Sequence, residues 1–139
     1  MRGHVDFDDL QSAHGYKPLP VYGTSKLCNI LFTRELAHRL AGTGVTANAL
    51  HPGLVATNFG KQAGGLYSLL FRFAIRGYGI PPEEGAKLII HLASSPDVAD
   101  KTGGYFVESG PPEPTAEAQD GNVARRLWAA SEKLAGMTW

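Results

Sequence analysis

Apolar residues recur at helical spacing along one long segment near the amino terminus. Between about Val21 and Leu40 they cover two adjoining sides of a helix. Gly42 follows, and glycine is common just beyond a helix end. Because this apolar surface is wider than one stripe, we expect the helix to be covered on two sides. Pro18 and Pro20 predict that residues 1–19 are irregular rather than helical.

Two short apolar runs have the length of buried strands. The first is Val45–Leu50, and the second candidate is Gly103–Val107. His51-Pro52-Gly53 follows the first run and predicts a turn, since a residue before proline avoids the α region.

Two further helices are predicted in the second half of the chain. Pro81-Pro82-Glu83-Glu84 is typical of a helix start, with acidic side chains at the positive end of the dipole, and this helix extends to about Ser94. Asp120 is expected to cap a last helix that ends near Gly136. This alternation of helices and strands indicates an α/β protein with a parallel sheet.

The segment Thr57–Ile80 is rich in glycine and aromatic residues. We expect a flap that includes a short helix near Leu66–Ile75. A helix lying on a membrane surface is the alternative for this segment, because Arg72 and Arg76 are one turn apart.

Composition excludes several classes of protein. The 139 residues include 13 Lys+Arg and 13 Asp+Glu, so the formal net charge is zero, and we expect no nucleic-acid partner. Cys28 is the single cysteine, which rules out an internal disulfide framework and a cysteine-based metal cluster. The five histidines lack metal-ligand spacing, so we expect no metal site.

The motif with the clearest chemistry is Tyr22-Gly23-Thr24-Ser25-Lys26. Residues four apart share one face of a helix, so Tyr22 and Lys26 should lie together. A free phenol, with a pKa of about 10, is a poor acid or base at pH 7, and a nearby ammonium favours the phenolate by its charge. The pair could then transfer a proton to or from a substrate oxygen. Taken alone, a tyrosine and a lysine at this spacing are more often exposed surface residues without a catalytic role.

In its context the motif resembles the short-chain dehydrogenase/reductase family, because a strand and the segment from Asn48 to Thr57 follow the helix. Other segments, in the right order, are similar to its retinol-dehydrogenase-like branch: Val5–Gln11, Leu31–Leu36, Leu92–Pro96, Gly104–Phe106 and Ala124–Trp128. The resemblance covers nearly the whole chain. It implies that residues 1–139 are the carboxyl-terminal part of a Rossmann-like doubly wound parallel sheet, with about two strands and three to four helices, and that the amino-terminal dinucleotide-binding half is absent.

The resemblance also implies roles for single residues. Tyr22 matches the catalytic acid/base, and Lys26 matches the residue that favours the phenolate and hydrogen-bonds the nicotinamide ribose. The implied cofactor is NAD or NADP.

Four residues after the predicted strand match further cofactor positions. Pro52 and Gly53 match a turn that lets the backbone approach the nicotinamide, and Val55 and Thr57 match positions that contact its carboxamide. A Pro-Gly turn at the carboxyl end of a strand agrees with where open α/β sheets bind ligands. A simple turn, and a helix cap at Thr57, are the alternatives.

Several parts of the family pattern are missing from these residues. They are the glycine-rich phosphate turn, the residue that selects NAD or NADP, the Asn-Ala-Gly segment and the catalytic asparagine. The catalytic serine would precede Val5, upstream of Met1, and neither Ser12 nor Ser25 matches it. We therefore expect impaired cofactor binding in this chain.

The resulting hypothesis is an NAD(P)-dependent oxidoreductase that transfers hydride between nicotinamide and a small apolar alcohol or carbonyl substrate, inactive as this chain alone. The alternative is a truncated non-enzymatic remnant, or an association module that uses its helices. A homodimer through the helices at 21–40 and 82–94 is the association that the resemblance implies. The expected location is the cytoplasm, and an upstream membrane anchor, which relatives of this branch can carry, stays open.

Overall fold

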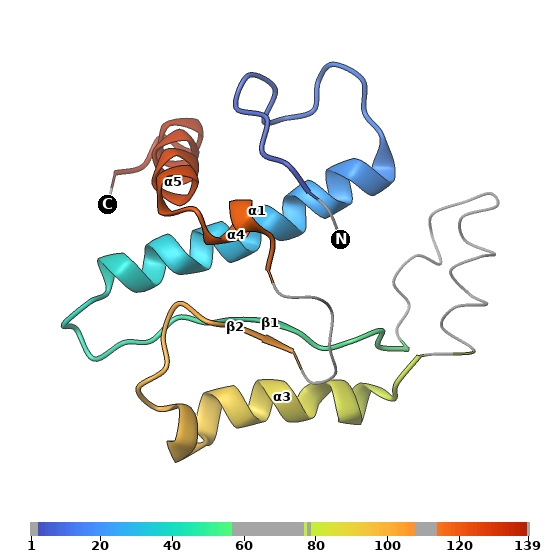
Figure 1. The fold of residues 1–139 in the computed structure, drawn as a ribbon, viewed down its shortest axis with the longest axis vertical. Helices are drawn as coiled ribbons and strands as arrows, with labels where there is room; N and C mark the ends of the chain where they lie inside the picture. Colours follow the sequence, from blue (N-terminus) through green and yellow to red (C-terminus); the bar gives the residue numbers. More distant parts are fainter. Residues whose placement is uncertain (1–2, 57–76, 78, 108–113, 139) are drawn as a thin grey trace. The chain divides into compact units, whose positions relative to one another are not determined.

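The computed structural model describes residues 3–56, 77, 79–107 and 114–138. Within these ranges the chain has an α/β fold of four α-helices and two parallel strands, as predicted (Figure 1). The elements, in chain order, are α1 (Pro18–Arg39), β1 (Ala49–His51), α3 (Pro82–Ser94), the 3-10 helix η1 (Pro96–Val98), β2 (Tyr105–Val107), α4 (Ala116–Gln119) and α5 (Gly121–Ala135).

The described residues form two compact units. The first takes its described residues from 1–49, 100–105 and 112–139, and the second takes them from 50–99 and 106–111. The flap and short helix expected within 57–80 lie almost entirely outside the described residues.

Helix α1 begins earlier than predicted. Its first residue is Pro18, so the expectation that residues 1–19 are irregular and that the helix begins near Val21 is wrong at this boundary. Pro18 and Pro20 both lie in the first turn, where a helix makes no use of the backbone N–H and where the fixed φ of proline is already helical. The helix ends at Arg39, before Gly42, whose φ is 80°.

The core of the first unit lies where α1 packs against α4 and α5 (Figure 1). Leu31 of α1 is fully buried, and the Phe32 ring stacks on the Trp128 ring of α5 with the centroids 5.1 Å apart. The buried Glu35 carboxylate accepts a hydrogen bond from Nε of Arg39 at 2.8 Å. Cover on two sides of α1 is met only in part, because Leu19 remains 64% exposed and Phe32 remains 47% exposed.

Both strands are shorter than predicted, since β1 is Ala49–His51 rather than 45–50 and β2 begins at Tyr105 rather than Gly103. The residues before each strand bond to one another irregularly. The Asn48 side chain donates from Nδ2 to the Lys101 carbonyl at 2.7 Å, and its Oδ1 accepts from the Gly104 amide at 3.0 Å. Gly103, with φ of 71°, adopts a left-handed conformation that ends extended pairing.

The other helix boundaries confirm the predictions. Helix α3 begins at Pro82 and ends at Ser94. The Asp120 side chain caps α5 by accepting from the amides of Asn122 and Val123, and Gly136, with φ of 64°, follows the last turn. The four-residue helix α4, capped by the Thr115 side chain, was not predicted. None of the helices in the described ranges has the length and apolar character needed to cross a membrane.

Candidate functional site

Tyr22 and Lys26 lie together at the start of α1, as the sequence predicts. The Lys26 Nζ atom is 5.2 Å from the centroid of the Tyr22 ring, within the range of a cation–π interaction. Tyr22 is half-buried, whereas Lys26 is exposed. The arrangement therefore places a positive charge beside a phenol that solvent or a ligand can reach.

The segment at residues 3–5 is held against this part of α1. The Thr24 hydroxyl donates to the His4 carbonyl at 2.9 Å. A Cβ at Gly3 would lie only 2.6 Å from the Gly23 carbonyl oxygen, so the two backbones are in close contact. The Glu117 carboxylate of α4 also accepts from the Val5 amide at 3.0 Å. The start of α1 is thus fixed by residues distant in the sequence.

The two serines near the motif have different local surroundings. The Ser25 hydroxyl donates to the Tyr22 carbonyl at 2.8 Å, one turn back along α1. Ser12 lies in a turn, with φ of 51° and its amide bonded to the Asp9 carbonyl at 2.9 Å. Both observations agree with the structural roles expected for them.

In the second unit, Pro52 and Gly53 form a turn directly after β1. Gly53 has φ of 79°, a left-handed conformation that favours glycine. A Cβ at Gly53 would lie 3.4 Å from Cδ1 of Ile80, so the turn packs against that side chain. The structure therefore confirms the predicted turn at the carboxyl end of the strand.

Val55 pairs with Ile80 in an isolated parallel bridge. The two hydrogen bonds of this bridge are made by Leu54 and Ala56, the residues on either side of Val55. The Ile80 amide donates to the Leu54 carbonyl and the Ala56 amide donates to the Ile80 carbonyl, both at 2.9 Å. Backbone groups alternate in direction along an extended chain, so the N–H and C=O of Val55 point away from Ile80. Neither group bonds to anything else in the part of the chain that the structure describes.

This backbone pair of Val55 has the donor and acceptor that an amide ligand needs. A carboxamide carries a carbonyl acceptor and an NH₂ donor, so both can bond to one residue's N–H and C=O. Thr57, the other position expected to contact the carboxamide, lies outside the described residues.

Gly85 was not singled out from the sequence, yet it contacts this segment. It is the only described residue of α3 that is buried, and a Cβ built on it would lie 2.7 Å from Cγ2 of Val55. A glycine inside a helix costs about 1 kcal/mol relative to alanine. Its presence in the first turn of α3 was therefore the sequence signal for a close contact.

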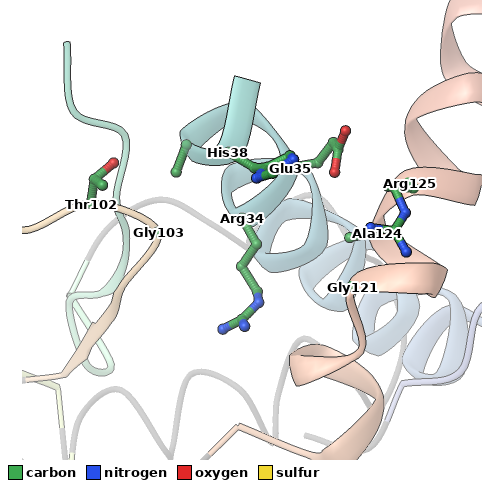
Figure 2. A pocket seen from close by; sticks show the side chains of 9 residues that line it. Arg34, Glu35, His38, Thr102, Gly103, Gly121, Ala124 and Arg125 are labelled. Carbon is green, nitrogen blue, oxygen red and sulfur yellow. The ribbon is translucent and has the colours of Figure 1, made fainter. Parts of the chain in front are cut away.

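An open cavity of about 490 Å³ lies elsewhere in the first unit, between α1, the start of α5 and the loop before β2 (Figure 2). Arg34 and His38 of α1 and Arg125 of α5 line it, but Tyr22 and Lys26 do not. Its acidic residue, Glu35, is bonded to Arg39. Because Tyr22 and Lys26 do not line it, we do not place the candidate site there.

No group of three or more His, Cys, Asp or Glu side chains able to hold a metal ion occurs among the residues with described positions.

Comparison with known proteins identifies relatives of this chain. The short chain dehydrogenase family matches residues 10–65, which include Tyr22, Lys26 and the Pro52-Gly53 turn. Human Retinol dehydrogenase 14 is 46% identical over 137 residues, and human Retinol dehydrogenase 13 is 41% identical over 141 residues. Each match covers 97% of this chain but only 41% and 42% of the relative.

A solved structure supports the fold. The crystal structure of an uncharacterized protein from Mycobacterium paratuberculosis superimposes with a TM-score of 0.67 at 27% identity, covering 97% of this chain and 46% of that one. The chain thus spans less than half the length of the relatives that it matches. By these matches the chain is similar to the short-chain dehydrogenase/reductase family, and to its retinol dehydrogenases in particular.

Proposed function

We propose that this chain carries the acid/base pair and the carboxamide-binding turn of an NAD(P)-dependent alcohol/carbonyl oxidoreductase. The observation that carries the proposal is the Lys26 ammonium 5.2 Å from the Tyr22 ring, at the start of α1 in a chain similar to this family. When bound, the nicotinamide of the cofactor supplies or accepts the hydride.

Tyr22 handles the proton that accompanies this hydride. Its hydroxyl donates a proton to the substrate oxygen when a carbonyl is reduced, and its phenolate takes the proton when an alcohol is oxidised. The positive charge of Lys26 lies beside this ring. As a three-donor ammonium, Lys26 is also suited to bond the ribose hydroxyls of the nicotinamide half.

The second unit contributes a binding surface for the carboxamide. The N–H and C=O of Val55, which bond to nothing else among the described residues, match its acceptor and donor, and Gly53 has no side chain that would obstruct a ligand. The phosphate-binding glycines of the family are absent from residues 1–139, so we expect this chain to bind the whole dinucleotide weakly.

The substrate class follows from the relatives. Retinol is the alcohol in the names of the proteins matched at 41–46% identity, and it is small and apolar. We therefore propose an apolar alcohol or its carbonyl product as the substrate. Because the chain spans about two fifths of those relatives, we propose this activity for the whole fold rather than for these residues alone.

The test is a chimera in which this chain follows the part of human Retinol dehydrogenase 14 that precedes the matched 137 residues. We expect turnover of retinol with NAD or NADP, and Tyr22→Phe should lower kcat about 100-fold or more, as loss of a general acid/base does. Tyr16→Phe, which removes a hydroxyl from a residue that is 66% exposed, is the matched control and should retain turnover. Activity of Tyr22→Phe within a few-fold of the parent would refute the assignment.

An association module is the second candidate function, and exposed apolar residues of α3 favour it. Ile89 is 51% exposed and Ile90 is 61% exposed. Adjacent isoleucines on a helix surface are typical of a protein contact, and we propose a homodimer that uses α3 together with α1. This function needs no cofactor, so tight, saturable binding of NADH or NADPH by the 139-residue chain would argue against a non-enzymatic remnant.

A further inference from the structure

Gly85 and Val55 fit together so closely that a side chain at position 85 would meet the valine. Gly85 lies in the first turn of α3, and its missing Cβ leaves the space that the Val55 side chain occupies. A Cβ there would be 2.7 Å from Cγ2 and 3.4 Å from Cγ1 of Val55. Heavy atoms in contact are normally about 3.5–4.0 Å apart, so an alanine at position 85 must displace either the valine or the helix.

Displacement of Val55 would also move its backbone. The side chain of an extended residue stands roughly perpendicular to the line of its backbone hydrogen bonds. The bridge to Ile80 holds one side of the segment through Leu54 and Ala56, and the contact with Gly85 holds the Val55 side chain. Together they determine where the N–H and C=O of Val55 lie.

We propose that Gly85 is a positioning residue for the carboxamide of the nicotinamide: by leaving room for the Val55 side chain, it holds the Val55 N–H and C=O where both can bond to that amide. This inference rests on the proposed function, because it assigns the carboxamide to Val55. Gly85 itself contacts no ligand and acts only through the valine. The surface concerned includes only residues of the second unit.

The experiment uses the ¹⁵N-labelled 139-residue chain and follows the Val55 amide cross-peak by NMR. The probes are nicotinamide mononucleotide and, as a control ligand, nicotinic acid mononucleotide, which has a carboxylate in place of the amide. In the parent chain we expect the first to shift the Val55 amide and the second to bind more weakly. The variants are Gly85→Ala and the matched control Gly121→Ala, which also adds a Cβ in the first turn of a helix but has open space around it.

Gly85→Ala should shift the Val55 amide in the free chain and weaken nicotinamide mononucleotide binding about fivefold or more, the cost of about one lost hydrogen bond. Gly121→Ala should do neither. The double variant Gly85→Ala, Val55→Ala replaces the two methyl groups that the new Cβ would meet. It should bind as tightly as Val55→Ala alone, so that the two substitutions are strongly non-additive.

The outcomes separate this inference from the function on which it rests. If the parent prefers the amide ligand and Gly85→Ala binds it within twofold of the parent, the positioning role is wrong and the proposed function stands. An unmoved Val55 amide in Gly85→Ala has the same meaning. If the parent binds neither mononucleotide, or does not distinguish them, the assignment of the carboxamide to Val55 fails and the positioning role fails with it. A double variant that stays as weak as Gly85→Ala would show general disruption of α3 and would also overturn the proposal.

Discussion

Cys28 is a residue near the candidate site whose thiol pKa is changed by its surroundings. It lies two residues beyond Lys26 on α1 and packs against the core of the first unit. Burial raises the pKa of its thiol, and the nearby Glu117 carboxylate raises it further by repelling the thiolate. Both effects disfavour the reactive thiolate form of Cys28.

The raised pKa of the Cys28 thiol predicts how its reactivity differs between the folded and the unfolded chain. Because the folded chain forms less thiolate at a given pH, Cys28 should react with a disulfide reagent at pH 8 at least severalfold more slowly in the folded chain than in the chain unfolded in urea. Ionisation is easier in the unfolded chain, so this thiol contributes stability below pH 9 and loses it as the pH rises further. The rate against pH, measured in both states, checks this. Equal rates at pH 8 would contradict it.

At the scale of elements, the boundaries of the helices follow local rules, whereas the ends of the strands do not. Asp120 and Gly136 determine the ends of α5 through contacts within a few residues, and such signals are legible in the sequence. The strands begin just after the point where Asn48 bonds to the loop at residues 101–104. No local pattern contains that contact, which joins residues more than fifty positions apart.

The cap of α5 gives a prediction at this scale. Asp120→Ala removes the acceptor of the Asn122 amide at 2.8 Å and of the Val123 amide at 3.4 Å. Loss of an N-cap costs about 1 kcal/mol of unfolding free energy, which urea denaturation followed by circular dichroism would measure. Asp100→Ala removes an exposed carboxylate with no bond in the described structure and serves as the control. Equal losses in the two variants would refute the capping role.

For the whole molecule, association with a partner depends on how much apolar helix surface remains exposed. Helix α3 buries only Gly85 among its described residues, and its isoleucines 89 and 90 remain exposed. The solved relative matches this chain over 46% of its own length, and in a doubly wound fold a helix of this kind packs on a larger sheet. An apolar helix surface that lacks such a sheet favours association with another surface.

This predicts concentration-dependent association of the purified chain. Replacing Ile89 and Ile90 with serine should shift the distribution in sedimentation velocity toward the monomer, because it removes apolar area from the contact. Leu134→Ser is the control, since Leu134 is 62% exposed but belongs to α5 in the other unit. Unchanged sedimentation of the isoleucine variant would argue against α3 as the interface.

The sequence by itself determined the features that depend on neighbours along the chain. The Tyr22–Lys26 pair follows from helical spacing, and the turn at Pro52-Gly53 follows from the backbone preferences of those two residues. The tertiary structure alone decided which residues surround them. That the N–H and C=O of Val55 point away from the paired chain depends on Ile80, and that its side chain fits depends on Gly85. Both partners are 25 or more positions from Val55 in the sequence. The spacing of apolar residues predicts only contacts within one helix or strand, so these contacts depend on tertiary packing.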